Sequence, residues 1–284
     1  MPGNNIIAAI FILLILPSCK NIFPDKNVGK SSESHINGLF LIHIISVRHG
    51  DEEKFIDHMK SVYLPVWYDL QDAGKLYETS VFQIKTVDSF QTEIPSKDFL
   101  ILIHLTPEML TEHIPEADID LKEFRLDNKS YFTALRSEIM TPTPSSFFPM
   151  RVSHNYERVE EIDFFVEFIH VNNSPEDLKQ YRSLMSSYFG PANGILVEKD
   201  FLFSFTAFET ERVISITDDE ASWNQIHISG DYPEYLDLNW DSLYTDLFGK
   251  EFSVNLDSLW DLLPDIEELP PYYSGHFIKE LHVH

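Results

Sequence analysis

The sequence predicts an α+β fold made of two tandem copies of one unit with the element order β-α-β-β-α-β. Apolar runs at 39–47 and 163–171 are each followed by a helical pattern that ends near a proline. The stretch "LIHLTPEML" (102–110) is echoed by "QIHISGDYPEYL" (225–236), where a histidine again precedes a Pro-Glu pair. With 284 residues, of which 43% are hydrophobic and 13% aromatic, the chain can bury a sizeable core.

The first copy starts at Leu39, where strongly patterned sequence begins. The helix that opens at Gly50-Asp51 has an apolar face of Phe55, Met59, Val62, Val66 and Leu70 at close to a 3.6-residue period. Pro65 lies inside that pattern and predicts a kink or an end near Leu64. The remaining predicted elements are strands at 75–87 and 97–105, a helix from Thr106-Pro107-Glu108, a second helical pattern around 129–139 and a closing strand at 145–156.

The second copy repeats this order. Ser174 is the predicted cap of its first helix, whose end, Tyr188-Phe189-Gly190-Pro191, matches Tyr63-Leu64-Pro65 of the first copy. The predicted elements are strands at 163–171, 200–216 and 223–229, helical segments at 233–247 and 257–263, and a closing strand at 272–283.

This element order is the split βαβ, or ferredoxin-like, unit, which covers one sheet face with helices and leaves the other face in need of a partner. Two copies in one chain can supply that partner to each other. We therefore expect repeat 1 at 39–158 and repeat 2 at 159–284, which together form a pseudo-dimeric α/β barrel.

The element order, and fragments such as "VWYDLQDAGKLYETSVFQI", resemble the dimeric α/β-barrel superfamily, which includes antibiotic-biosynthesis monooxygenase-like, EthD-like and NIPSNAP-like families. The resemblance covers about 39–284 and implies a barrel with a central cavity. Members range from cofactor-free oxygenases and haem-handling proteins to proteins with no known reaction. Haem is thus compatible with the resemblance, but no motif of the sequence requires a cofactor, and the fold does not settle the function.

The N-terminal region resembles a bacterial lipoprotein signal. An uninterrupted apolar run from Ile6 to Leu16 suits a signal-peptide core and is too short to span a bilayer. The following Leu16-Pro17-Ser18-Cys19 resembles a lipobox, although Ser stands where Gly or Ala is usual and no Lys or Arg precedes the run. Cys19 is the only cysteine. We expect a signal peptide at 1–18, lipidation of Cys19, and a flexible tether at 19–38.

The localisation that follows is the bacterial cell envelope, with the acylated Cys19 in the lipid bilayer of the outer membrane or of the periplasmic face of the inner membrane. A plain secretory signal or a buried N-terminal helix is the alternative. With 46 acidic and 21 basic residues, the net charge of −25 disfavours nucleic acid as a partner.

Strand alternation nominates polar residues for the cavity. Imidazole and carboxylate groups together could abstract a proton or bind a metal, whereas the alternative is that each is a half-exposed or core residue. The candidates are His43, His104, Glu167, Ser204, Thr206, Gln225, His227 and Ser229. A weaker metal set is His276, Glu280 and His282, which alternate near the chain terminus. Gly-rich phosphate loops, His-Glu-x-x-His helices and Gly-x-Ser-x-Gly elbows are absent from the sequence.

Three functions remain open from the sequence. The first is a membrane-anchored binding module with a small apolar or aromatic ligand in the barrel, suggested by 22 Phe and 12 Tyr residues. The second is a cofactor-independent monooxygenase-like or haem-handling enzyme that uses His43 or His227. The third is a structural or interaction lipoprotein without chemistry.

Overall fold

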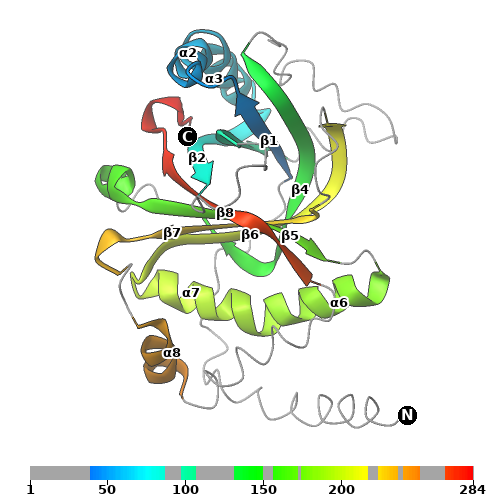
Figure 1. Ribbon diagram of the computed structural model, residues 1–284, viewed down its shortest axis with the longest axis vertical. Coiled ribbons are helices and arrows are strands. Elements are labelled where there is room, and N and C mark those ends of the chain that lie inside the picture. Colours follow the sequence, from blue (N-terminus) through cyan, green and yellow to red (C-terminus); the bar gives the residue numbers. More distant parts are fainter. Residues whose placement is uncertain are drawn as a thin grey trace. The chain divides into compact units, whose positions relative to one another are not determined.

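The computed structural model describes residues 39–86, 97–106, 131–149, 156–171, 174–216, 223–235, 239–249 and 266–283. Eight strands form a closed barrel (Figure 1). They are β1 (Phe40–Val47), β2 (Leu76–Thr86), β3 (Phe99–Leu105), β4 (Phe132–Phe148), β5 (Asp163–Val171), β6 (Leu202–Ile216), β7 (Gln225–Asp231) and β8 (Ile266–Phe277).

The sheet order is β1-β3-β2-β8-β5-β7-β6-β4, and every neighbouring pair is antiparallel. The first four strands lie in the order β4-β1-β3-β2, and the last four in the equivalent order β8-β5-β7-β6. Two joints, β2–β8 and β4–β6, close the barrel between these halves. The predicted fold class, two ferredoxin-like repeats in one α/β barrel, is therefore confirmed.

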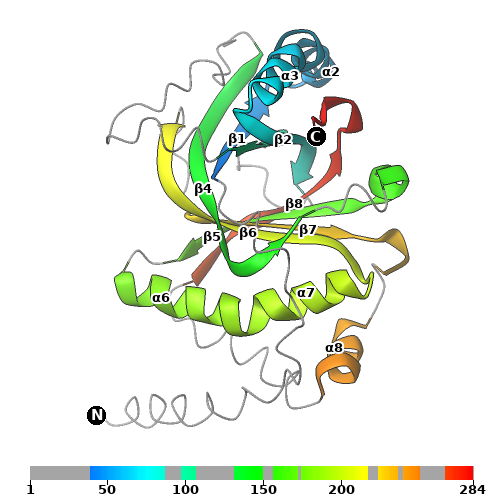
Figure 2. The ribbon, with the colours of Figure 1, turned by 180° about the vertical axis from the view of Figure 1, so that it is seen from behind.

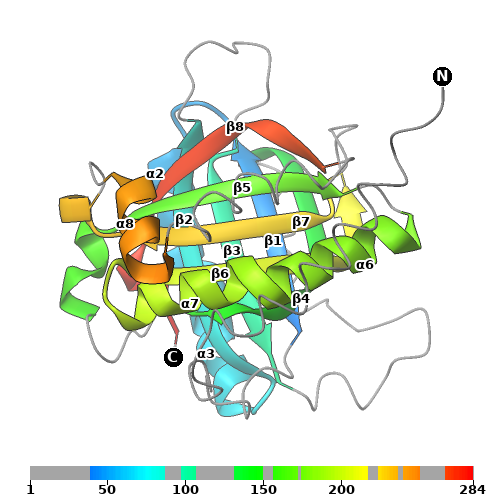
Figure 3. The same cartoon turned by 90° about the horizontal axis from the view of Figure 1, so that it is seen from below.

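One helical segment covers the outer face of each half (Figures 1 and 2). In the first half α2 (Glu52–His58) continues through the π-helical η1 (Met59–Tyr63) into α3 (Leu64–Asp72). In the second half α6 (Pro175–Leu184), the π-helical η4 (Met185–Phe189) and α7 (Gly190–Glu198) follow the same pattern, and Figure 3 shows them lying along β6 and β7. The predicted Ser174 cap is present, with its hydroxyl accepting a hydrogen bond from the Asp177 N–H.

The π-helical segments explain a difference from the predicted helix. Each one ends two residues before a proline, Pro65 or Pro191, so the helix continues through the predicted break as a wider turn. The wider turn shifts the helical phase. As a result Val62, expected on the apolar face, is 44% exposed, whereas Trp67 is buried.

The barrel has two apolar clusters, one in its interior and one on its outer face. The interior cluster draws on both halves and includes Phe40, Ile42, Phe164 and Val166. A second cluster lies between the first half's strands and α2–α3, and includes Leu41, Ile45, Phe55 and Trp67. On β1 the even-numbered residues thus face the interior and the odd-numbered ones face the helices.

The strands of the barrel belong to one compact unit, and α8 (Trp240–Phe248) belongs to another. Asn239 caps α8 by accepting a hydrogen bond from the Ser242 N–H, within the helical region predicted at 233–247. Among the residues that the structure describes, none of the helices is both long enough and apolar enough to cross a bilayer. Cys19, the tether, the helix predicted to start at Thr106-Pro107-Glu108 (apart from Thr106 itself) and the pattern at 257–263 lie outside the described residues.

Two predicted elements were wrong. The segment 129–139 was expected to be helical, but residues 132–139 belong to the long strand β4, which is paired on both sides, with β1 and with β6. The closing strand expected at 272–283 ends at Phe277, and a 3₁₀ turn at Lys279–Leu281 follows. In β4, pairing with two neighbouring strands overrides the local helical preference.

Candidate functional site

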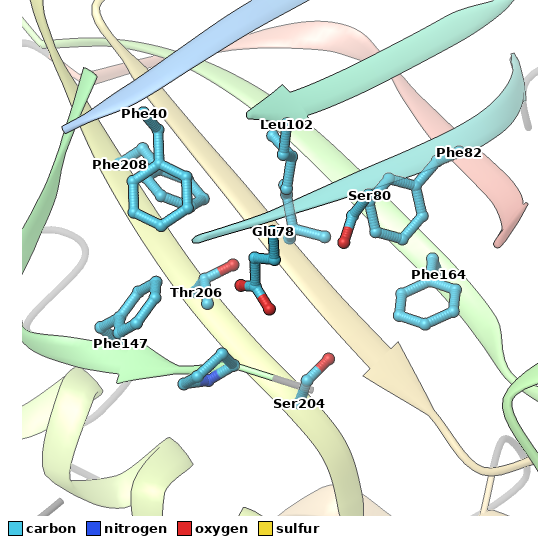
Figure 4. Close-up of a pocket in the computed structure, with 12 residues that line it drawn as sticks. Phe40, Glu78, Ser80, Phe82, Leu102, Phe147, Phe164, Ser204, Thr206 and Phe208 are labelled. Carbon is cyan, nitrogen blue, oxygen red and sulfur yellow. The ribbon is translucent and has the colours of Figure 1, made fainter. Parts of the chain in front are cut away.

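The barrel interior contains a hollow that both halves line (Figure 4). Its cavity volume is about 40 Å³. This volume has room for roughly three water molecules. Its walls are Phe40, Phe82, Leu102, Phe147, Pro149, Phe164, Phe208 and Ile228, and its polar lining residues are Glu78, Ser80, Ser204 and Thr206.

Glu78 is the ionisable residue that lines this cavity. Figure 4 shows its carboxylate pointing into the hollow toward Ser204 and Thr206. Its side chain is 36% exposed, so this end of the cavity meets solvent. Burial among the aromatic walls raises the pKa of Glu78 above its ordinary value.

His104 lies beside this cavity. Its ring stacks on Phe40 with a centroid distance of 4.3 Å. Its Nδ1 lies 3.9 Å from Oε1 of Glu78, which is longer than a hydrogen bond. Of the predicted cavity residues, His104, Ser204 and Thr206 therefore lie on the interior side of the barrel, and Ser204 and Thr206 line the hollow directly.

The polar groups of the cavity occupy equivalent positions of the two repeats. Ser80 pairs with Leu102 on β3, and Thr206 pairs with Ile228 on β7. Counting along β2 and β6 from this match makes Glu78 the equivalent of Ser204, and Phe82 the equivalent of Phe208. The repeats thus supply three matched pairs to one cavity, and they differ in charge at the first pair.

The other predicted cavity residues face outward. His43, between Leu41 and Ile45 of the helix-side cluster, has its Nδ1 2.8 Å from the Ser137 hydroxyl. Glu167, Gln225, His227 and Ser229 lie on the outer face of β5 and β7, because Val166, Ile226 and Ile228 of the same strands face the interior. The predicted convergence of His43, His104, Glu167 and His227 in one cavity is therefore absent from the structure.

Glu167 and His227 nonetheless meet outside the barrel, under α6. The His227 Nε2 lies 2.5 Å from the Tyr181 hydroxyl, and its Nδ1 lies 3.5 Å from Oε2 of Glu167. The nearby carboxylate favours the imidazole proton on Nδ1, so Nε2 accepts the hydrogen bond that Tyr181 donates. Burial, together with Glu209 and Glu167, raises the pKa of Tyr181 well above its ordinary value. Tyr181 is completely buried, so this group is a structural link between helix and sheet.

The repeated histidines of "LIHL" and "QIHI" are not structural equivalents. His104 pairs with Phe40 on β1, whereas the residue that pairs with Phe164 on the equivalent strand β5 is Gly230. His227 instead takes the place of Ile101, on the face toward the helices. The two similar sequence stretches are therefore out of register: their histidines occupy different positions along the equivalent strands β3 and β7. By contrast, the match of His43 with Glu167 agrees with the registers of β1 and β5.

A network of charged and aromatic side chains fills another part of the interior. Arg136 donates two hydrogen bonds to the buried Glu138 carboxylate, which also accepts from Thr210 and from the indole N–H of Trp223. Lys97 is buried, and its Nζ lies 5.1–5.5 Å from the ring centroids of Phe168, Trp223 and Tyr273. These side chains fill this part of the barrel interior, and their contacts stabilise it.

The metal and haem interpretations do not fit the described residues. In the weaker metal set, His276 lies at the end of a strand, Glu280 lies in a 3₁₀ turn and His282 follows that turn, so the three do not share one strand face. His282 is buried, with its Nδ1 2.6 Å from the Thr79 carbonyl oxygen, whereas His276 is exposed. In the described part of the chain, no three His, Cys, Asp or Glu side chains form a metal-binding group. The cavity is too small for haem, and the His104 ring is stacked on Phe40.

Sequence reasoning missed Glu78 and Ser80. The signal was present in "YETSVFQI", where alternation places Glu78, Ser80, Phe82 and Ile84 on one face of the predicted strand 75–87. Pairing this strand with "FLFSFTAFE" would have aligned Glu78 and Ser80 with Ser204 and Thr206.

Comparisons with known proteins give fold-level likenesses only. No protein-family model matches the chain, and none of the curated proteins matches it. Among solved structures, an anthrone oxidase-like protein is 14% identical, with a TM-score of 0.45 over 84% of this chain and 90% of the other. A proposed monooxygenase from Lactobacillus acidophilus is 10% identical, with a TM-score of 0.41 over 84% and 93%. A proposed chlorite dismutase is 10% identical, with a TM-score of 0.38 over 86% and 96%. At these values the likeness carries no conclusion about activity, and the fold assignment rests on the sheet order itself.

Proposed function

We propose that the barrel binds a small organic ligand in the cavity beside Glu78. The observation that carries this proposal is the placement of four polar side chains, Glu78, Ser80, Ser204 and Thr206, around a hollow with otherwise aromatic and aliphatic walls. Polar groups inside an apolar core are costly unless they find partners. A ligand that has both a polar group and an apolar body satisfies both kinds of wall.

The size of the hollow restricts the ligand. A cavity of about 40 Å³ accommodates a polar group with a few heavy atoms, and a larger body would extend toward the open mouth at Glu78. The barrel is thus mostly filled by its own side chains. This favours a small ligand over the flat polycyclic compounds that a wide cavity could hold.

Native mass spectrometry of the full chain, purified without added ligand, tests the proposal. A stoichiometric extra mass that disappears on denaturation is expected, and it should be lost in Thr206→Leu, which fills the cavity. Ser215→Leu, at an exposed position of the same strand, is the matched control and should retain the mass. A bare chain that also fails to bind any compound of a small-molecule library would overturn the proposal and favour an interaction protein without a ligand.

We also propose that Cys19 carries the lipid anchor and that the barrel is held at the bacterial envelope. The support is the apolar run Ile6–Leu16 followed by Leu16-Pro17-Ser18-Cys19, with no other cysteine in the chain. The N-terminal peptide of the mature protein should start at Cys19 and carry the mass of the acyl groups. Cys19→Ala should abolish membrane association, and an unmodified Cys19 in the mature wild-type chain would contradict the proposal.

A further inference from the structure

We propose that the ligand of the Glu78 cavity is a small organic amine, bound in its protonated form with the ammonium group beside the Glu78 carboxylate. This inference rests on the ligand-binding function proposed above and names the chemical class of the ligand. It follows from the composition of the walls, from the way the same barrel holds its own lysine, and from the charge partners of its glutamates.

The walls of the cavity match a cation. Five phenylalanine rings surround the hollow, and the negative face of an aromatic ring attracts an ammonium group. An ammonium group carries only hydrogen-bond donors, whereas the Glu78 carboxylate and the three hydroxyl groups can all accept. The Glu78 carboxylate would neutralise the charge of such a ligand, since it points into the hollow (Figure 4).

The barrel interior already holds one ammonium group among aromatic rings. The Lys97 Nζ lies within 5.5 Å of the centroids of Phe168, Trp223 and Tyr273, and the residue is only 6% exposed. An ammonium group near aromatic rings, the kind of contact that we propose for the ligand, thus already occurs in the interior of this barrel.

Glu78 differs in its partners from Glu138 and Glu209, the buried glutamates of the described chain. Arginine side chains bind the carboxylates of Glu138 and Glu209, through Arg136 and Arg182. Near Glu78, in the part of the chain that the structure describes, the basic group is the His104 imidazole at 3.9 Å. A carboxylate that points into an apolar cavity without an arginine or lysine partner leaves a place for a cation from outside.

The charge of the whole chain adds to this preference. A net charge of −25 attracts cations to the mouth of the cavity and repels anionic ligands. A small carboxylate or phosphate ligand would meet both this field and the Glu78 charge. Both the net charge of the chain and the Glu78 carboxylate attract a cationic ligand.

The test compares benzylamine with benzyl alcohol, two compounds of nearly equal shape that differ in charge at neutral pH. Isothermal titration calorimetry on the full chain should show the amine binding about tenfold or more tighter than the alcohol, the range of a charge-assisted hydrogen bond. Glu78→Gln should remove this preference and leave the affinity for the alcohol unchanged. Glu198→Gln removes the same charge at an exposed position of α7 and should keep the preference.

Each other result has a definite meaning. Equal affinities for amine and alcohol, both lost in Thr206→Leu, would overturn the amine class while the ligand-binding function stands. Equal weakening of amine binding in Glu78→Gln and Glu198→Gln would show attraction to the acidic surface and would also overturn the inference. Binding of neither compound would overturn the amine inference. A bare native mass together with no binding from the small-molecule library would remove the binding function as well. An unchanged circular dichroism spectrum of Glu78→Gln establishes that the variant is folded.

Discussion

Asp231, at the end of β7, has a carboxyl group whose charge the fold disfavours. Burial, followed by the charges of Asp163 and Glu167, raises its pKa from 3.8 to about 6. Because the folded-state pKa is raised, this residue lowers stability as the pH rises from about 4 through 6, where the folded chain retains a proton that the unfolded chain releases.

Asp231→Asn should therefore stabilise the protein at pH 7.5 and change little at pH 4. The gain is at most about 3 kcal/mol, because a pKa difference of about two units sets the upper limit. Urea unfolding at the two pH values measures it, and Asp57→Asn, at an exposed position of α2, is the control. An equal effect of Asp231→Asn at both pH values would contradict the raised pKa.

Tyr181 is the second residue with a definite stability effect. Its hydroxyl lies 2.5 Å from the His227 Nε2, and both side chains are buried. Tyr181→Phe removes the partner of a buried ring nitrogen and should lower the free energy of unfolding by about 1–3 kcal/mol. Tyr68→Phe, at a position that is 48% exposed, should change the urea midpoint little. An unchanged midpoint for Tyr181→Phe would show that His227 finds another partner.

At the scale of elements, Gly190 fixes the approach of α7 to β4. A Cβ atom at this position would lie 2.1 Å from the Ser145 carbonyl oxygen, and Ser145 itself has a positive φ of 58°. Gly190→Ala should therefore push the helix away from the strand and destabilise the protein by about 2–4 kcal/mol. Leu64 precedes Pro65 in the first half as Gly190 precedes Pro191 in the second, so Leu64→Ala is the comparison variant. Thermal unfolding measures the melting temperatures of both variants. A melting temperature for Gly190→Ala within about 1 °C of the wild type would contradict the close approach.

The elements also show why only part of the site could be predicted. The order of strands and first helices followed from periodicity, but β1 is buried along its whole length, so alternation could not tell the helix side from the interior. His43 was consequently assigned to the wrong face. The pattern at 129–139 suggested a helix, whereas the pairing of β4 with two neighbouring strands decides the structure.

At the scale of the whole molecule, the two halves share one interior. The joints β2–β8 and β4–β6 run between the halves, and the interior cluster contains residues of both. We expect the barrel to unfold in a single transition. In a chain with Trp240 and Trp260 replaced by Phe, fluorescence reports on Trp67 of the first half and Trp223 of the second. Trp67→Phe and Trp223→Phe versions should give the same urea midpoint by fluorescence as by circular dichroism, and separate midpoints would show that one half unfolds first.

The equivalence of Glu78 in the first repeat with Ser204 in the second has a consequence for how such a barrel can evolve. In a barrel assembled from two identical chains, a carboxylate at one of these positions would be repeated at the other, and two like charges facing each other across a small hollow cannot both ionise readily. Fusion of the copies into one gene removes this constraint, since each copy then mutates independently. A single carboxylate on the wall of such a cavity is therefore available to a fused chain, whereas a homodimer would have to carry two.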